Sequence, residues 1–434
     1  MLKPAFLFVL SFAIVVFSFT LFPEGMFVDG LTYASISRNL SEGLGSIWLP
    51  HYTQYLSPEF YGHPPLSFII QSWFFSVFGD HLWVERFYTF ITFLLQLRLI
   101  QGIWNLLPTK KDNYWIPMCL WLMCGSVFWS FSNNLIENTN ALFISGSVYF
   151  FIKACIKQQS HLFFLGGLSC FLSLLTKGPF GLFVLSTPMV YHLFTRKQGF
   201  FRYLKYYLII LTAIIIPLSV VLIISPESQS FFQNYFNKQI VNSVQNETTV
   251  QSRWFIVAQF IKNIAAILII AIVVFSLFRK KIQLNPFTYI LFIIALIGVF
   301  PIMISMKQRA FYITPVYPLV AISFGLIIDQ VLHLKSKASW IRPLSLILLI
   351  CSILFAINSL TKYNRDEVLI SQIKQLSEKT PKGSVIKIDQ SHIDDYYLYA
   401  YFQRYLSASL TANCDTCSFH LELENESKPI LTKK

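Results

Sequence analysis

Charged side chains that could act on a phosphate-bearing substrate gather in one polar loop and in three short motifs further along the chain. The loop, residues 23–65, is rich in aromatic and turn-forming residues and follows a first apolar run. The candidate residues of the loop and the motifs are Asp29, His63, Glu137, Lys177, Lys307 and Arg309. Fixed cations would neutralise a phosphate, and a carboxylate would take a proton or bind a metal. The combination predicts a phosphate-handling site.

Each of these residues has a simpler interpretation when it is taken alone. A Lys or Arg at the end of an apolar helix usually extends its charge to the membrane interface and anchors the helix. Asp29 would cap a helix that begins at Leu31. Glu137 would be a solvated loop acid, and His63, which precedes two prolines, would be a turn residue. Spacing alone therefore does not name a reaction.

The composition of the 434-residue chain is that of an integral membrane protein. Hydrophobic residues make up 55% and charged residues 13% of it, about half the charged share of ordinary domains. The mean hydropathy is +0.56. The net charge of +13 does not indicate nucleic-acid binding, because the basic residues cluster in short loops between apolar runs. Such clusters are the orientation signal of a multi-span protein.

Apolar runs near the length that crosses about 30 Å of hydrocarbon predict about eleven membrane spans. The candidate spans are 4–22, 84–106, 114–131, 140–156, 161–175, 179–195, 203–224, 254–277, 286–304, 311–329 and 341–360. The first one lacks the small-residue exit of a cleavable signal, so we interpret it as a retained anchor. Residues 66–79 are apolar but too short to cross, and we expect an interfacial or re-entrant helix there.

The distribution of basic residues predicts the orientation of these spans. With the N-terminus in the cytoplasm and the C-terminus outside, the basic clusters fall inside and most acids fall outside. The same topology brings the polar loop and the three motifs to the outer face. Lys177, Lys307 and Arg309 then lie on the side that this rule depletes of basic residues, which favours a functional role over simple anchoring.

The end of the chain has a different composition and predicts a small α/β unit on the outer face. A helical stretch near 365–378 is followed by a turn at 380–383 and a strand-like run at 384–388. We therefore divide the chain into a membrane domain, 1–360, and an extracytoplasmic domain, 361–434.

Two features of this C-terminal segment could be taken for metal or redox sites. Cys414 and Cys417 form a lone CxxC motif without a second pair or a nearby His, so a local disulfide in an oxidising compartment is the preferred interpretation. An acidic cluster is interpreted as a solvated turn in preference to a metal site. Its members are Asp389, His392, Asp394 and Asp395.

The motifs follow one another in a recognisable order. They are Asp29 with Tyr33 and the run ASISRNL that ends at Leu40, Tyr61-Gly62-His63-Pro64-Pro65, Glu85-Arg86, Glu137, Leu175-Thr176-Lys177-Gly178-Pro179, and the segment from Lys307 through Tyr312 to Pro318. In this order they resemble the GT-C glycosyltransferases of the bacterial aminoarabinose-transferase and protein O-mannosyltransferase type. Those integral membrane enzymes move a sugar from a polyprenyl-phosphate carrier.

The resemblance implies a fold and a location. The fold is an all-α polytopic membrane protein of GT-C type with about eleven transmembrane helices and juxtamembrane helices in the first outer loop, 23–65. A small C-terminal α/β domain follows. The implied location is the bacterial cytoplasmic membrane, with the N-terminus cytoplasmic and the C-terminus extracytoplasmic.

The resemblance also implies roles for individual residues. Asp29 would be the catalytic base or a metal-site residue, and Glu137 would be a second acid. The implied ligands of the carrier phosphate are His63, Lys177, Lys307, Arg309, Tyr33 and Tyr312. A divalent metal ion is the only cofactor considered, with Asp29 and Glu137 as its candidate ligands.

The implied reaction moves a sugar, with inversion, from a polyprenyl-phosphate donor such as an undecaprenyl-phosphate sugar. The acceptor would be a lipid, a glycan or a protein on the outer face, as in lipid A modification. Membrane lipids surround the protein, and no nucleic-acid partner is expected.

The acid cluster is thinner here than in many members of that family. Gly30 stands where many have Glu, Gly62 stands where many have an acid before the His or Lys, and Thr32 stands where a basic residue is common. These departures leave metal dependence and the identity of the base open.

A transporter or lipid-linked sugar flippase is the main alternative function. Such proteins usually show internal repeats and ionisable residues at mid-membrane depth. We find no internal repeat, and the ionisable residues lie at span ends. A purely structural membrane protein is disfavoured because the polar motifs pool on one face. Neither the sugar nor the acceptor follows from these residues.

Overall fold

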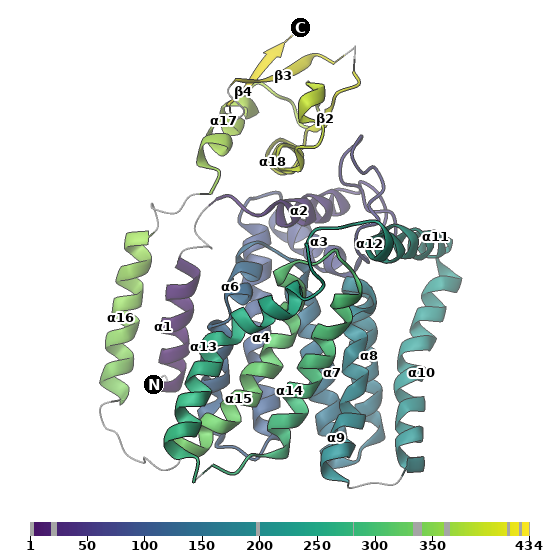
Figure 1. Ribbon diagram of the computed structural model, residues 1–434. Helices are drawn as coiled ribbons and strands as arrows, with labels where there is room; N and C mark the ends of the chain where they lie inside the picture. Colours follow the sequence, from purple (N-terminus) through teal and green to yellow (C-terminus); the bar gives the residue numbers. More distant parts are fainter. Residues whose placement is uncertain are drawn as a thin grey trace.

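Helices packed side by side form most of the protein (Figure 1). The computed structural model describes residues 4–18, 24–196, 200–280, 282–332, 341–359, 365–414, 417–424 and 428–433. The long helices of the bundle are α4 (Val84–Leu106), α7 (Ile136–Lys157), α8 (Ser160–Lys177), α10 (Phe200–Ile224), α13 (Phe255–Phe278), α14 (Pro286–Val299) and α15 (Tyr317–Leu332). Two further helices, α1 (Pro4–Ser18) and α16 (Ile341–Ser359), pack against each other at one side of the bundle.

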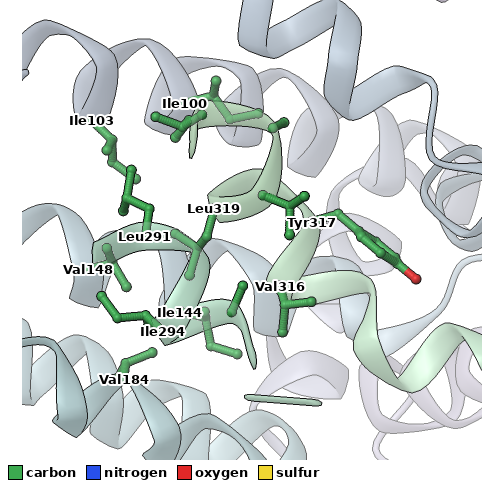
Figure 2. Close-up of a cluster of buried hydrophobic side chains, with 14 of the residues drawn as sticks. Ile100, Ile103, Ile144, Val148, Val184, Leu291, Ile294, Val316, Tyr317 and Leu319 are labelled. Atoms are coloured by element: carbon green, nitrogen blue, oxygen red, sulfur yellow. The ribbon is translucent and has the colours of Figure 1, made fainter. Parts of the chain in front are cut away.

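The centre of the bundle is a continuous apolar core. Ile100 of α4, Val148 of α7 and Leu291 of α14 are fully buried in it. Figure 2 shows their side chains together with Leu319 of α15, which points among them. Helices of this kind bury apolar side chains against one another on the inner side and expose them on the other, because lipid takes the place of water there. Ile216 of α10, for example, is 57% exposed.

Within the described residues, seven helices are long and apolar enough to cross a membrane, or eight if one bent pair is a single span. That count takes Ser160–Thr195 as one helix, although the chain reverses direction at Gly178. Gly178 has φ +70°, and Cys170 Sγ lies 3.9 Å from the carbonyl oxygen of Gly181. Separate spans on the two sides of Gly178 agree with this reversal, and the number of eleven spans stays a prediction. Residues 19–22 of the first candidate span lie outside the described part of the chain.

The candidate span 114–131 differs from the prediction, because it is broken. A short 3-10 turn (Lys111–Tyr114) and α5 (Trp115–Leu122) meet α6 (Gly125–Ser132) at a bend of 80°. The side chain of Asn263 in α13 accepts a hydrogen bond from Ser126 N at 2.8 Å. This bond satisfies a backbone donor at the start of α6 that has no partner within the helix.

The two helices that follow α1 in the chain form a layer across one end of the bundle (Figure 1). They are α2 (Val28–Ser41) and α3 (Leu66–Phe78). With 13 residues, α3 is about 20 Å long at 1.5 Å per residue, shorter than the hydrocarbon layer. This agrees with the interfacial or re-entrant helix expected at 66–79.

The rest of the same end is formed by helices and turns that connect the long helices. They are the 3-10 turn Gly178–Ser186 leading into α9 (Thr187–Thr195), α11 (Pro226–Tyr235), a π-helical turn (Phe236–Val241), α12 (Asn242–Gln245), and the 3-10 turns Phe300–Ile304 and Ala310–Val316. Of these, α9 runs back toward the opposite end of the bundle (Figure 1).

The C-terminal segment forms a small sheet with two helices above this layer (Figure 1). The strands are β1 (Val385–Ile388), β2 (Ser409–Thr411), β3 (Phe419–Glu424) and β4 (Lys428–Lys433), and the helices are α17 (Glu367–Ser377) and α18 (Tyr396–Leu406), with a 3-10 turn at Gln390–His392. The strand order is β2-β1-β3-β4, with β1 parallel to both neighbours and β3 antiparallel to β4. The helix near 365–378 and the strand at 384–388 were therefore correctly predicted.

Other features of the C-terminal segment also agree with the predictions made from the sequence. Cys414 and Cys417 form a disulfide. Asp395 accepts hydrogen bonds from the backbone N–H groups of Tyr397 and Leu398, so it caps α18. Asp389 lies 3.4 Å from His420. The division into two domains remains our proposal.

Buried ion pairs hold the C-terminal segment to the end of the bundle that α2 and α3 cover. The guanidinium of Arg404 in α18 donates to both carboxylate oxygens of Glu85 at 2.9 Å and to Asp80 at 2.7 Å. Arg38 of α2 donates to the carbonyl oxygen of Gln403 at 3.0 Å. Leu31 of α2 belongs to the same apolar cluster as the helices beneath the sheet. The C-terminal segment thereby fixes the position of α2, which carries Asp29.

Candidate active site

Helix α2 places Asp29 and Tyr33 on successive turns at the end of the bundle that α2 and α3 cover. Asp29 is half-buried in the first turn, where a carboxylate is favoured by the positive end of the helix dipole. The helix starts at Val28, and no side chain caps it. The simpler interpretation, a cap for a helix beginning at Leu31, is therefore wrong.

A turn at Asn133 and Asn134 sets the position of α2. Asn133 Oδ1 accepts from Phe27 N at 2.7 Å, and Asn134 Nδ2 donates to the carbonyl oxygen of Gly30 at 3.1 Å. A Cβ atom at position 30 would lie 1.9 Å from the carbonyl oxygen of Asn133. Only glycine allows this approach, so the second acid that many resembling enzymes carry here has no room. The asparagine turn was not among the predicted site residues.

Glu137 and Lys177 form a buried ion pair between α7 and the end of α8. Glu137 is 1% exposed and Lys177 is 9% exposed, and Glu137 Oε1 accepts from Lys177 Nζ. The ammonium group also lies 4.4 Å from the centre of the Tyr312 ring, a favourable cation–π position. The interpretation of Glu137 as a solvated loop acid is wrong, because its carboxylate lies in the interior.

His63 contacts Tyr33 and is kept neutral by its surroundings. Its Nε2 atom lies 3.0 Å from the Tyr33 hydroxyl. Burial lowers the pKa of the imidazole well below its usual value, and the positive charges of Lys177 and Lys307 lower it further. The Tyr33 hydroxyl can donate to Nε2 or accept from it, and in the tautomer in which it donates, the ring proton is on Nδ1. Nδ1 is buried and has no partner within the described residues.

Lys307 and Arg309 come from the segment that follows α14. Lys307 Nζ forms an ion pair with Glu247 Oε2 at 2.7 Å and donates to Gln239 Oε1 at 3.3 Å. Arg309 is exposed, and the described residues include no ion pair to it. Sequence reasoning missed Gln239 and Glu247, which come from a polar connection with no motif of its own.

The electrostatic environment gives Asp29 an unusual acidity. Burial raises the pKa of its carboxyl from 3.8 to about 6, and the nearby Glu137 carboxylate adds to the rise. Lys177, Arg309 and Lys307 act in the opposite direction. A carboxylate with a pKa near 6 can accept a proton at neutral pH more effectively than an ordinary aspartate.

A cavity of about 600 Å³ joins several of these residues. Its polar lining includes His63, Lys177, Lys307, Gln239 and Tyr312. Much of the rest of its wall is apolar and is formed by side chains of α14 and of the turns after α8 and α14, among them Phe180, Phe183, Ile297, Ile302 and Ile304. The cavity therefore has the two-part character of a ligand with a charged head and a hydrocarbon tail.

Asp29, Tyr33, Glu137 and Arg309 are not among the residues that line this cavity. Tyr33 and Glu137 are linked to its lining through His63 and Lys177, respectively. Asp29 and Arg309 are close enough to the lysines to share their electrostatic field. The structure thus brings the predicted residues into one region, in which the two lysines, His63 and Tyr312 line the cavity.

A second hollow of about 480 Å³ adjoins the first and shares Gly62 and Gln239 with it. It is formed by residues 56–62 and by Lys238. The Lys238 ammonium lies 4.7 Å from the centre of the Tyr61 ring. This hollow opens beside His63 and is polar enough for a hydroxyl-bearing group.

The carboxylates of this region do not fit a metal site. Within the described residues, no group of three or more His, Cys, Asp or Glu side chains is arranged to hold a metal ion. The Glu137 carboxylate is already paired with the ammonium of Lys177, a charge that a bound cation would have to face at close range. These residues therefore give no basis for a metal-dependent step.

Comparison with known proteins gives a consistent picture. The family model for dolichyl-phosphate-mannose-protein mannosyltransferases matches residues 62–224, a stretch that contains His63, Glu137 and Lys177. A search of curated protein sequences finds no match.

Solved structures match over almost the whole chain. ArnT from Cupriavidus metallidurans bound to undecaprenyl phosphate is 16% identical, with a TM-score of 0.66, covering 94% of this chain and 85% of ArnT. The apo state of the same protein is 17% identical, with a TM-score of 0.64, covering 92% and 83%. The oligosaccharyltransferase of Archaeoglobus fulgidus is 13% identical, with a TM-score of 0.54, covering 96% of this chain and 65% of that one.

Proposed function

We propose that this chain, which has the fold of the GT-C membrane glycosyltransferases, transfers a sugar from a polyprenyl-phosphate carrier to an acceptor on the outer face of a bacterial cytoplasmic membrane. The observation that carries this proposal is the cavity with lysines and a histidine at one part of its wall and apolar side chains along the rest. A polyprenyl phosphate has the matching chemistry. The similar fold of ArnT, whose structure was solved with undecaprenyl phosphate bound, supports this choice of ligand.

In the proposed reaction, an acceptor hydroxyl attacks the anomeric carbon of the sugar while the bond from that carbon to the phosphate oxygen breaks. Asp29 takes the proton of the hydroxyl, for which its raised pKa suits it. The leaving polyprenyl phosphate gains negative charge. Lys177, Lys307 and Arg309 stabilise that charge, and His63 donates from Nδ1. A single displacement of this kind inverts the anomeric configuration.

Tyr33 and Glu137 act on the reacting groups indirectly in this scheme. The Tyr33 hydroxyl holds the His63 ring in place through Nε2, and burial together with nearby carboxylates raises the Tyr33 pKa well above its usual value, so it stays protonated. Glu137 holds Lys177 in the interior and raises the pKa of Asp29. Tyr312 packs against the Lys177 ammonium.

Ligand binding tests the carrier site directly. Because a ligand that binds only the native state raises its stability, undecaprenyl phosphate should raise the thermal stability of the purified protein in detergent. Lys307→Met and Lys177→Met should each reduce this gain. Lys374→Ala is a matched control, since Lys374 of the C-terminal segment forms an exposed ion pair with Glu24. This variant should keep the full gain in thermal stability.

Transfer itself is tested in cells that express the wild-type chain or Asp29→Asn. Mass spectrometry of envelope lipids, glycans and proteins should show a sugar-sized mass gain only with the wild-type chain. Carrier binding without any mass gain would favour a lipid-linked sugar flippase. Absence of carrier binding in the wild type would contradict the proposed function.

A further inference from the structure

The lysines that line the cavity are each already paired with a glutamate. Lys177 is paired with Glu137, and Lys307 is paired with Glu247. Arg309 and Asp29 lie close enough to these pairs to share their electrostatic field, and one further cation and one further carboxylate, Lys238 and Glu59, line the adjoining hollow. With Asp29 ionised, these positive and negative side chains are equal in number. A site of this composition attracts an anion much less than its cations alone would.

Glu247 is held in place beside Lys307 by its own segment. Its Oε1 atom accepts from Asn242 Nδ2 at 2.9 Å, and its backbone N–H donates to the carbonyl oxygen of Asn242 at 3.1 Å. Oε2 contacts Lys307 Nζ at 2.7 Å. Glu247 is 33% exposed, and it is not part of the cavity wall. The carboxylate is thus oriented toward the lysine without blocking the cavity.

A phosphate bound by Lys307 would lie close to this carboxylate. An oxygen in charge-assisted contact with Nζ sits about 2.8 Å away from it, so phosphate and carboxylate oxygens sharing that ammonium would be about 5 Å apart. At that distance the repulsion between two unit charges in water weakens binding roughly fourfold. The repulsion grows with the charge of the phosphate.

We propose that Glu247 is a specificity-determining residue that disfavours the product carrier relative to the donor. This inference rests on the proposed function. The donor is a phosphodiester with a single negative charge, whereas the released polyprenyl phosphate is a monoester that carries about 1.5 to 2 charges near pH 7. Glu247 repels the monoester more than the diester, so it favours release of the product and lowers the occupancy of the site by the carrier phosphate.

The test compares the affinity of two probes for wild type and Glu247→Gln. The probes are undecaprenyl phosphate and its monoanionic methyl ester, titrated against the purified protein at constant ionic strength. Gln keeps the shape and the hydrogen-bonding oxygen while removing the charge. We expect the affinity for the monoester to rise roughly tenfold and that for the methyl ester roughly fourfold, by the Coulomb estimate above. Glu247→Ala should show the same preference, because the cause is the charge.

Glu227→Gln provides the matched control. Glu227 lies on the same connection between α10 and α13, and its carboxylate accepts from Ser46 Oγ at 2.6 Å. This variant should leave both affinities unchanged. An unchanged or weakened monoester affinity in both Glu247 variants, or equal gains for the two probes, would overturn the inference and leave the carrier site intact. If the wild type binds neither probe, the proposed function itself fails.

Discussion

Replacing Asp29 with asparagine should make the protein more stable and inactive at the same time. The carboxyl of Asp29 is placed where burial and the Glu137 carboxylate oppose its ionisation, and these effects raise its pKa from 3.8 to about 6. The folded state therefore carries an energetic penalty for holding this group ionised. Asparagine has the same shape and no charge, so it removes the penalty together with the proposed base.

The magnitude follows from the pKa shift. A shift of about two units at about 1.4 kcal/mol per unit corresponds to roughly 3 kcal/mol. Because the folded-state pKa is the raised one, the favourable contribution of Asp29 is complete below pH 3.8 and is lost as the pH rises through 6. Asp29→Asn should thus exceed the wild type by up to about 3 kcal/mol above pH 7 and should equal it near pH 4.

Thermal unfolding in detergent at a series of pH values measures this difference. The gap in melting temperature between Asp29→Asn and the wild type should open as the pH increases from 4 to 8. Asp29→Glu is a useful companion, because it keeps the charge and should show no gain at high pH. A gap that is absent or reversed at pH 8 would refute the burial argument. Sugar transfer by Asp29→Asn at the wild-type rate would refute its role as the base.

Three further outcomes follow from the geometry. The rate of transfer should fall as the pH decreases through about 6, roughly tenfold per unit below it, because Asp29 must be ionised to accept a proton; a rate that is flat between pH 5 and 7 would point to another base. Gly30→Ala should reduce both the yield of folded protein and activity, because its Cβ would meet backbone 1.9 Å away; detergent size-exclusion chromatography measures the first effect. Arg404→Met should lower the free energy of unfolding by about 3 to 5 kcal/mol, because it leaves the buried Glu85 without Arg404 as its partner. Lys374→Ala should lower it by less than about 1 kcal/mol, because that ion pair is exposed. Thermal unfolding measures both changes.

The features that could be predicted from sequence are those that the membrane imposes. Long apolar runs must become helices there, because no water satisfies the backbone, and thirteen residues are too few to span. Lys177 and Lys307 stand out in the sequence because the predicted orientation puts them on the side that is usually depleted of basic residues, and both line the cavity. The order of the motifs predicted the GT-C type of fold, and the structural match to ArnT confirms that fold.

The parts that could not be predicted depend on contacts between distant segments. Glu247 and Lys307 are separated by 60 positions, and no local pattern marks the polar connection that carries Glu247. Arg404 reaches Glu85 across the sequence, and an isolated arginine in a charged tail gives no sign that it will be buried. The break between α5 and α6 is similar, since the backbone N–H at the start of α6 donates to a side chain of another helix, Asn263.

Glycine at position 30 links the thin acid cluster to the rest of the site. The close approach of α2 to the Asn133 turn leaves no room for a second loop acid, and it holds α2 against the start of α7, where Glu137 lies. A second carboxylate near Asp29 comes instead from Glu137 in the first turn of α7, where the ammonium of Lys177 compensates its charge. The carboxyl of Asp29 then has a raised pKa because of its burial and the nearby Glu137 carboxylate. In the proposed mechanism, one loop aspartate and one buried ion pair together provide a proton acceptor suited to neutral pH.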